Sequence, residues 1–251
     1  MTNHPILAYH NGIFLDSIDA RPLRILSEYL EPLHRLREEH VHDTVVFFGS
    51  ARTPKNNIYY QDAQELAKQL TRWSLTLEGD RRFVICSGGG GGIMEAANRG
   101  ASEAGGRTIG FNIGLPQEQR PNSYLAPELT FEFHYFFMRK LWFSHLARAL
   151  VVFPGGFGTL DELMEMLTLA QTRKIDRDIV ILLYGSEYWK EIINFDALVK
   201  HGMISSSDLK LFKFVDDVPT AFETLKEKLP LHYESDTPCL AKSKVVTYDR
   251  T

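Results

Sequence analysis

Short apolar runs alternate with longer segments of helical periodicity along most of this chain. The runs that we expect to be strands are TVVFFG (44–49), RFVICS (82–87), RTIGFNI (107–113), LTFEFH (129–134), ALVVFP (149–154), DIVILLY (178–184) and LFKFV (211–215). Between most of them lie helical patterns such as YYQDAQELAKQLTRWS and VPTAFETLKEKL. Near-continuous apolar strands that alternate with helices predict a mostly parallel sheet covered on both faces. The expected fold class is α/β, Rossmann-like and doubly wound.

The first forty residues follow a different pattern. Leucines recur three or four positions apart, at Leu23, Leu26, Leu30, Leu33 and Leu36. This spacing predicts an amphipathic helix or helix pair, in which Pro32 marks a break or a new first turn. We expect an N-terminal helical extension (1–40), packed on the main domain or on a neighbouring subunit. A Rossmann-like nucleotide-binding and catalytic domain (41–230) and a loosely attached C-terminal tail (231–251) follow.

The composition of the chain excludes several classes of protein. It has 251 residues, a net charge of −4, 44% hydrophobic and 24% charged residues, so it gives no sign of nucleic acid or an anionic membrane as partner. No apolar run approaches the ~18 residues of a membrane span, and the first residues lack a signal-peptide layout. Cys86 and Cys239 are too few for a disulfide framework. We expect a cytoplasmic protein.

Three of the expected strands end in turns that contain glycine: FFGSAR, CSGGGGG and FPGGFGT. In a parallel α/β sheet, ligands bind outside the carboxyl ends of the strands, so these turns are where a site is expected. The second turn has five consecutive glycines, each of which costs conformational entropy on folding. We interpret this run as backbone that approaches a ligand closely, with Gly88, Gly89 and Gly90 as candidate contacts.

The third glycine turn leads into a helical pattern. Thr159 as N-cap, with Glu162 three residues later, fits a capping box, but a capping box does not explain the glycines at 155, 156 and 158. Glycines that leave amides bare before a helix N-terminus form an anion site. The P-loop and dinucleotide-binding patterns are both absent from the glycine clusters. A phosphorylated mononucleotide is therefore the ligand that fits best.

An aromatic stretch, FEFHYFFMRKLWF (131–143), precedes this turn. Most of its aromatic residues are expected in the core or in a subunit interface. Arg139 and Lys140 either extend to the surface on their aliphatic stems or, for Arg139, point at a carboxylate, phosphate or base; their spacing leaves both interpretations open. His134 belongs to no metal-binding pattern, and no metal site is expected.

The motifs together resemble a known family. PGGFGTLDE resembles the P-G-G-x-G-T-x-x-E signature of the LOG proteins, the cytokinin riboside 5′-monophosphate phosphoribohydrolases, many of which were once labelled lysine decarboxylases. MRK resembles the Arg-Lys pair of that family, and GGGGGIMEAANRGA resembles its G-G-G-x-G-x-M-E helix entry, with Gly91 where close relatives often carry proline. The resemblance runs from about Thr44 to about Phe214. The extension and the longer tail are similar to those of the larger bacterial members.

The resemblance implies that Arg139 and Glu162 are the catalytic pair and that no metal or organic cofactor is needed. It also implies a set of substrate-binding positions: Gly155, Gly156, Phe157, Gly158 and Thr159 in the ligand loop, Met138 and Lys140 opposite, and Thr168 further along the helix. Glu95, in the first turn after the glycine run, is a further candidate for contacts to ribose or water. An acid that only interacts with the helix dipole explains Glu95 equally well.

These residues predict a hydrolase. Cleavage of an N-glycosidic bond passes through an oxocarbenium-like ribose. A carboxylate such as that of Glu162 can stabilise this cation, or it can deprotonate the attacking water. We expect hydrolysis of a nucleoside 5′-monophosphate, such as a cytokinin riboside monophosphate or AMP, to free base and ribose 5-phosphate. The alternative is a non-catalytic nucleotide or cofactor carrier, which would have no need of that carboxylate.

Two further expectations complete this interpretation. A pyridoxal-dependent decarboxylase is not expected, because Lys140 is the only lysine near the motifs and no partner for a pyridine ring nitrogen lies beside it. A homo-oligomer, with a dimer as its basic unit, is expected, because the aromatic run and the leucine stripe exceed what one domain needs to bury. Which base is preferred is left open by the sequence.

Overall fold

The computed structural model describes residues 5–78, 81–114, 120–175 and 179–229, and these form an α/β protein around one sheet. All strand pairs are parallel, in the order β4-β3-β2-β1-β5-β6-β7. The strands are β1 (Thr44–Phe48), β2 (Val84–Ser87), β3 (Thr108–Ile113), β4 (Thr130–Phe133), β5 (Ala147–Val152), β6 (Val180–Tyr184) and β7 (Lys213–Val215). Each overlaps a predicted run, and the predicted fold class is confirmed.

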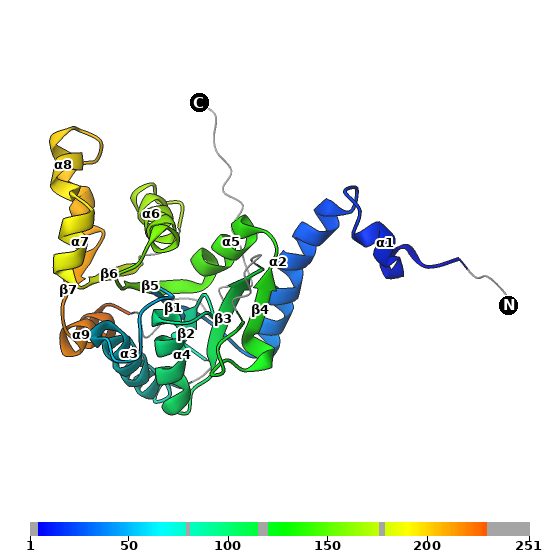
Figure 1. The fold of residues 1–251 in the computed structure, drawn as a ribbon, viewed down its shortest axis with the longest axis horizontal. Helices are drawn as coiled ribbons and strands as arrows, with labels where there is room; N and C mark the ends of the chain where they lie inside the picture. The colour runs from blue at the N-terminus through cyan, green and yellow to red at the C-terminus, as the bar shows by residue number, and fades with distance from the viewer. Residues whose placement is uncertain (1–4, 79–80, 115–119, 176–178, 230–251) are drawn as a thin grey trace.

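Most of the helices lie in two layers, one on each face of the sheet, whereas α1 lies away from it (Figure 1). They are α1 (Gly12–Leu15), α2 (Arg21–Glu38), α3 (Ile58–Ser74), α4 (Ile93–Glu103), α5 (Phe136–Leu146), α6 (Phe157–Gln171), α7 (Ser186–Ile192), α8 (Phe195–Lys200) and α9 (Val218–Lys228). Alternate residues of a strand point to opposite faces. Val45 and Phe47 of β1 therefore pack in a core cluster with α3, α4 and α9. Val46 and Phe48 pack in a second cluster with α2, α5, α6 and α7.

The predicted break at Pro32 is wrong, because α2 continues through it. Proline has no amide hydrogen to donate to the carbonyl four residues earlier, which here belongs to Glu28. The indole Nε1 of Trp142 on α5 donates to that carbonyl instead, at 2.9 Å. The carboxylate of Glu28 also accepts hydrogen bonds from the amides of His134 and Tyr135, at 2.7 and 3.2 Å, just before α5 begins. Helix α2 thus positions the start of α5.

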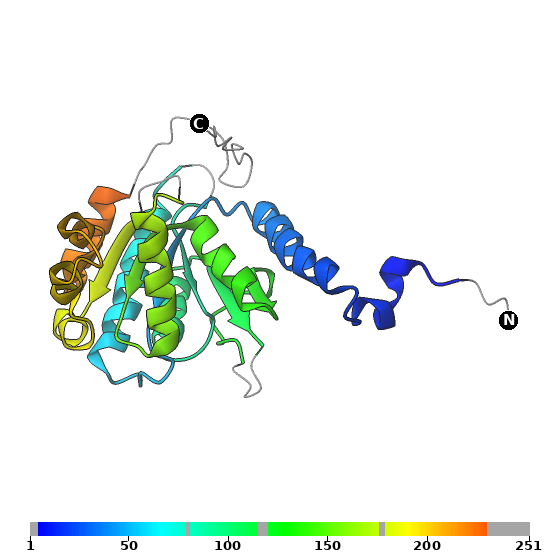
Figure 2. The same cartoon turned by 90° about the horizontal axis from the view of Figure 1, so that it is seen from above.

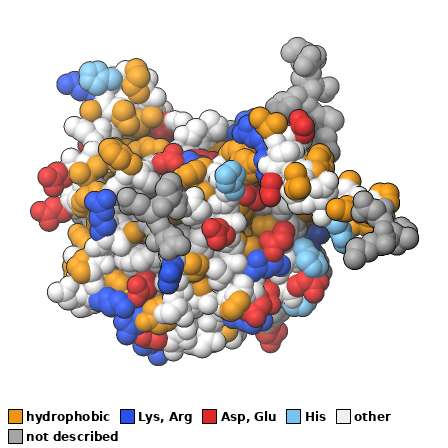
Figure 3. Space-filling model, turned by 45° about the vertical axis from the view of Figure 1, so that its right-hand side comes forward, with side chains coloured by type: hydrophobic (Ala, Val, Ile, Leu, Met, Phe, Trp, Pro, Cys, Tyr) orange, Lys and Arg blue, Asp and Glu red, His pale blue; other side chains and the backbone are white. Residues whose placement is uncertain are grey.

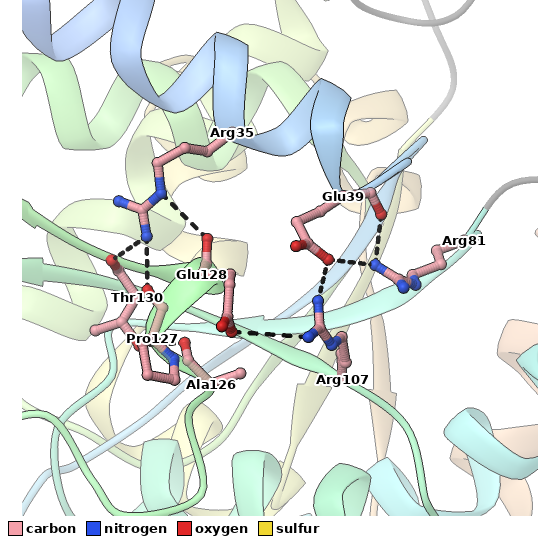
Figure 4. Close-up of polar contacts among 8 residues, drawn as sticks. All are labelled: Arg35, Glu39, Arg81, Arg107, Ala126, Pro127, Glu128 and Thr130. Atoms are coloured by element: carbon pink, nitrogen blue, oxygen red, sulfur yellow. Dashed lines mark hydrogen bonds and ion pairs between the residues drawn. The ribbon is translucent and has the colours of Figure 1, made fainter.

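Hydrogen bonds from Arg35 and ion pairs of Glu39 hold the C-terminal end of α2 on the sheet (Figure 4). The guanidinium of Arg35 donates to the carbonyls of Pro127, Glu128 and Thr130, and it lies over the Phe131 ring. Glu39 forms ion pairs with Arg81 and Arg107, which come from the starts of two neighbouring strands. The carboxyl group of Glu39 has a lowered pKa because these two guanidinium groups hydrogen bond to it.

The N-terminal half of α2 and the residues before it project away from the sheet (Figure 2). The predicted leucine stripe is accordingly divided: Leu36 is fully buried, whereas Leu23, Leu26 and Leu30 are about half exposed. Exposed apolar side chains continue to the start of the described chain (Figure 3), namely Ile6, Leu7, Tyr9, Ile13, Phe14 and Ile18. We call residues 5–30 the N-terminal arm. In the described residues no helix is both long and apolar enough to cross a membrane, and the predicted tail (231–251) lies outside them.

Candidate functional site

The strand order reverses between β1 and β5, because β2, β3 and β4 lie on one side of β1 and β6 and β7 lie beyond β5. Such a topological switch point is where ligands bind in doubly wound sheets. A pocket of about 810 Å³ lies there. Its lining comes from the turns after β1 and β5 and from α4, α5, α6 and α7. The pocket thus joins the first and third glycine turns of the sequence, and the second turn contributes Gly88.

Helix α6 begins earlier than the capping-box interpretation requires. Its N-cap is Gly156, and no side chain caps it. The capping box is therefore wrong: Thr159 lies in the first turn, and Glu162 lies a further turn along. The first helical hydrogen bond runs from the Leu160 amide to the Gly156 carbonyl, at 3.0 Å. The amides of residues 157–159 precede that bond, and all three residues line the pocket, so this wall of the pocket suits an anion.

The glycines of this loop have two different causes. A Cβ at Gly155 would meet the Thr159 hydroxyl oxygen at 2.1 Å, so the fold itself requires glycine there. A Cβ at Gly156 or Gly158 would meet no atom within 4 Å, and neither residue has a positive φ. Glycine inside a helix costs about 1 kcal/mol relative to alanine. No protein atom explains the glycine at 158, and close approach of a ligand there stays a prediction.

The run of five glycines is explained mainly by packing of the protein against itself. Gly89 and Gly92 have positive φ, and their Cβ atoms would collide with the Asn112 side chain and the Ser50 carbonyl. The first amide of α4, that of Ile93, already donates to Ser50. Of the three glycines predicted to contact ligand in this run, Gly88 lines the pocket; the carbonyls of Gly89 and Gly90 accept hydrogen bonds from Asn122.

Arg139 and Glu162 meet in the pocket wall. The Nη2 of Arg139 lies 3.4 Å from Oε1 of Glu162, and both side chains line the pocket. Their side chains are 15% and 5% exposed. The Nε of Arg139 is buried and makes no hydrogen bond within the described structure. Of the two interpretations of Arg139, the structure therefore supports the one that points it at a carboxylate.

The carboxyl group of Glu162 is electrostatically unusual. Burial raises its pKa to about 7, although the nearby charges of Arg139 and Lys140 oppose that rise. Burial also lowers the pKa of Arg139, but a guanidinium stays protonated in proteins at neutral pH. A carboxyl group with a pKa near the working pH is suited to accept or donate a proton. The pair thus combines a fixed positive charge with a group that can titrate.

Several predicted contact residues lie outside the pocket lining, and their roles as direct contacts stay predictions. Met138 is buried in the core beneath α5. The ammonium group of Lys140 lies 2.8 Å from carboxylate oxygens of Asp161 and Glu165. Glu95 pairs with Lys55, and the Thr168 hydroxyl donates to its own helix.

Other lining residues were not singled out from the sequence. Ser50 and Arg52 belong to FFGSAR, whose glycine was the available signal. The amide of Arg52 donates to the Ser50 hydroxyl oxygen, and its guanidinium adds a positive charge to the lining. Tyr188 on α7 also lines the pocket, and no glycine or motif pointed to it. The remaining wall is apolar, formed by Phe48, Met94, Ile113, Phe136 and Phe143.

The fold and this pocket define a Rossmann-like α/β protein with an uncapped helix N-terminus and a buried acid at its switch point. Residues 94–225 match the sequence model of the family described as "Possible lysine decarboxylase", and the chain belongs to that family, the LOG family of the relatives below. Its matched part begins at α4 and includes the Arg139–Glu162 pair and the glycine loop at 155–158.

Curated relatives and solved structures agree with this assignment. The chain is 28% identical over 200 residues to "Probable cytokinin riboside 5′-monophosphate phosphoribohydrolase LOGL3" of Oryza sativa subsp. japonica, covering 75% of this chain and 85% of the relative. It is 29% identical to the Arabidopsis thaliana enzyme LOG5, covering 79% and 82%. The Moco carrier protein of Chlamydomonas reinhardtii has a similar structure, with a TM-score of 0.50 and 25% identity over 74% of this chain and 98% of the carrier.

Proposed function

We propose that this protein hydrolyses the N-glycosidic bond of a nucleoside 5′-monophosphate and releases the free base and ribose 5-phosphate. The observation that carries the proposal is the Arg139–Glu162 pair, which borders the same pocket as the open N-terminus of α6. An anion site without chemistry would not need a buried carboxyl group with a pKa of about 7. The relatives named as phosphoribohydrolases support the same reaction.

The pocket accommodates the three parts of such a substrate in order. The 5′-phosphate is held by the amides of residues 157–159. Glu162 lies one turn further along α6, so the ribose falls beside its carboxylate. The base then lies against the apolar wall around Phe48 and Phe143. An apolar wall accepts a flat adenine-like ring, and it tolerates an alkyl substituent on that ring.

The reaction needs one water molecule and no other reagent. The bond between the anomeric carbon and the base nitrogen breaks, and its electron pair leaves with the base. Glu162 stabilises the resulting oxocarbenium character and takes a proton from the attacking water, whose oxygen forms the new bond to the anomeric carbon. That proton then passes to the nitrogen of the departing base, so the base leaves neutral and Glu162 is returned to its carboxylate form. Arg139 keeps that carboxylate oriented, and its positive charge stabilises the negative charge that develops on the departing base.

A non-catalytic carrier is the second candidate, and it is favoured by one specific finding. The Moco carrier protein shares this fold over almost its whole length. A carrier would retain the anion site and the apolar wall but would release its ligand unchanged. The two functions therefore predict the same binding and different products.

A product screen separates these candidates. Purified protein is incubated with nucleoside monophosphates, including AMP and isopentenyladenosine monophosphate, and with the matching nucleosides. We expect free base and ribose 5-phosphate from the monophosphates, at rates far above those for the nucleosides, because remote phosphate binding helps to position the ribose. Tight binding of the whole panel with every ligand recovered intact would identify a carrier.

Glu162→Gln tests the assigned role of the carboxylate. The substitution retains the size of the side chain but removes its charge and its basicity, so we expect turnover to fall by ~10²–10⁴-fold. Glu165→Gln is a matched control, since Glu165 lies on the same helix, pairs with Lys140 and does not line the pocket. Near-normal turnover of Glu162→Gln would remove the carboxylate from the mechanism.

A further inference from the structure

The peptide between Gly155 and Gly156 is held by a side chain from another helix. The hydroxyl group of Tyr188 on α7 donates to the Gly155 carbonyl at 2.6 Å. The next carbonyl in the chain, that of Gly156, is already fixed by the helix, because it accepts from the Leu160 amide. Tyr188 therefore holds the peptide that stands immediately before α6.

This peptide has more rotational freedom than an ordinary one. It is flanked by glycine on both sides, so no Cβ restricts the dihedral angles on either side of its plane. In a trans peptide the carbonyl and the amide point in opposite directions. A rotation of the plane would exchange the two, and a carbonyl oxygen would then stand where the Gly156 amide stands. A carbonyl dipole presented to an anion is repulsive, whereas an amide attracts it.

Tyr188 is itself held firmly. The indole Nε1 of its neighbour Trp189 is fully buried and lies within hydrogen-bond distance of the carbonyls of Val152 and Tyr184, at the ends of β5 and β6. The Ser186 amide at the start of α7 donates to the carboxylate of Asp216. These hydrogen bonds fix the position of α7, and α7 in turn fixes the phenol of Tyr188 beside the glycine loop. Both Tyr188 and Gly155 line the pocket.

We propose that Tyr188 is a positioning residue that holds the Gly155–Gly156 peptide with its amide toward the anion site, so that the Gly156 N–H adds a fourth donor to the amides of residues 157–159. The phenol acts through the loop and on the phosphate part of the ligand alone. This inference rests on the proposed function only in taking the ligand's anionic end to lie at α6. It requires no hydrolysis, so it applies to an enzyme and to a carrier alike.

The test compares ligands with and without a phosphate. Calorimetry gives the dissociation constants of AMP and of adenosine for Glu162→Gln protein, in which consumption of the ligand is slowed ~10²–10⁴-fold, with and without Tyr188→Phe. Removing the hydroxyl keeps the ring and its packing. We expect AMP to bind about 5- to 10-fold more weakly, the size of one lost hydrogen bond, and adenosine to bind unchanged.

The control is Tyr184→Phe in the same background. Tyr184 precedes α7, and its hydroxyl donates to Asp62 at 2.9 Å, outside the pocket lining. We expect this variant to keep the ratio of AMP to adenosine affinity. The positioning role is overturned if Tyr188→Phe leaves the ratio of AMP to adenosine affinity unchanged. This includes an equal loss of affinity for both ligands, which would indicate that the substitution disturbs the fold in general.

The outcomes for the two proposals are distinct. If the original protein prefers AMP to adenosine but releases no base, the hydrolase proposal fails and the role of Tyr188 is still decided by the ratio. If the original protein shows no preference for AMP, the phosphate site at α6 is wrong, and the role of Tyr188 is overturned with it.

Discussion

At the scale of single residues, the carboxyl group of Glu162 gives the protein a pH dependence. Its pKa is raised from 4.5 to about 7, chiefly by burial. Below pH 7 it is protonated and cannot act as a base, so we expect kcat/KM to rise with pH and to level off above about 7. A pH–rate profile from 5 to 9 measures this. A rate that falls through pH 7 would instead make Glu162 the general acid.

The raised pKa of Glu162 also affects the stability of the protein. Stability is measured without substrate, so it reports the titration of Glu162 and not that of the substrate phosphate, which titrates near pH 6. Between pH 4.5 and 7 the folded state holds a proton that the unfolded state has lost, so the free energy of unfolding falls as pH rises through this window. Across it, the original protein should lose up to about 3 kcal/mol relative to Glu162→Gln. Urea denaturation of both proteins at pH 5 and pH 8 tests this; parallel changes would contradict the raised pKa.

The substitution Gly158→Ala is predicted to raise the stability of the fold and to lower the affinity for AMP. The Cβ position at Gly158 is empty of protein atoms, so Gly158→Ala adds helix propensity and should stabilise the fold by up to about 1 kcal/mol. The added methyl group occupies the pocket, so AMP should bind more weakly. Calorimetry and thermal unfolding measure the two effects. Gly12→Ala, in the N-terminal arm and equally free of neighbours, is the control for binding. Unchanged AMP affinity in Gly158→Ala would leave the glycine unexplained.

Residue chemistry was predictable from the sequence where a motif carried it. The glycine loop at 155–158 and the Arg139–Glu162 pair were predicted to belong to one site, and the structure brings them into one pocket; their roles in binding and catalysis stay predictions. The capping box was wrong because Gly156 lets α6 begin earlier, which no local pattern reveals. Tyr188 was missed because its function depends on α7 folding back over β5 and β6, a contact between residues 33 positions apart.

At the scale of elements, Pro32 in α2 shows how a tertiary contact overrides a local rule. A proline predicts a helix break because one carbonyl loses its partner. Here Trp142 supplies the missing donor, so the helix continues and is joined to α5. The strands were predictable because their apolar runs report burial directly. The length of α2 could not be predicted, since its continuation through Pro32 depends on the indole of Trp142, 110 positions further along the chain.

The pairing of Pro32 with Trp142 predicts a measurable coupling. Trp142→Phe removes the indole donor and leaves the Glu28 carbonyl without it, which should destabilise the protein. In a Pro32→Ala background the new Ala amide can donate to that carbonyl, so the same Trp142→Phe substitution should cost less. We expect a coupling of about 1 kcal/mol in a double-mutant cycle measured by urea denaturation. Additive effects would mean that the indole bond does not compensate for the proline.

At the scale of the whole molecule, the N-terminal arm leaves a long apolar surface uncovered. Ile13 and Ile18 are 89% and 83% exposed, and the half-exposed leucines of α2 lie on the same projecting arm (Figure 3). Monomeric proteins rarely expose apolar patches of this extent. The same leucine stripe is buried at Leu36 and exposed toward the N-terminus of α2, so the exposed part resembles a core surface that lacks its packing partner. We propose that a second copy of this chain covers the arm, in a dimer or a higher assembly.

Light scattering at micromolar concentration tests self-association, and substitutions locate it. We expect the original protein to be at least a dimer. Leu26→Glu combined with Leu30→Glu should shift it toward the monomer, because two charges placed on the apolar stripe would lose their hydration in the assembly. Ile58→Glu is the control: Ile58 is 59% exposed, but it lies at the start of α3, away from the arm. A monomeric original protein, or an equal shift in the control, would show that the arm is not the contact surface.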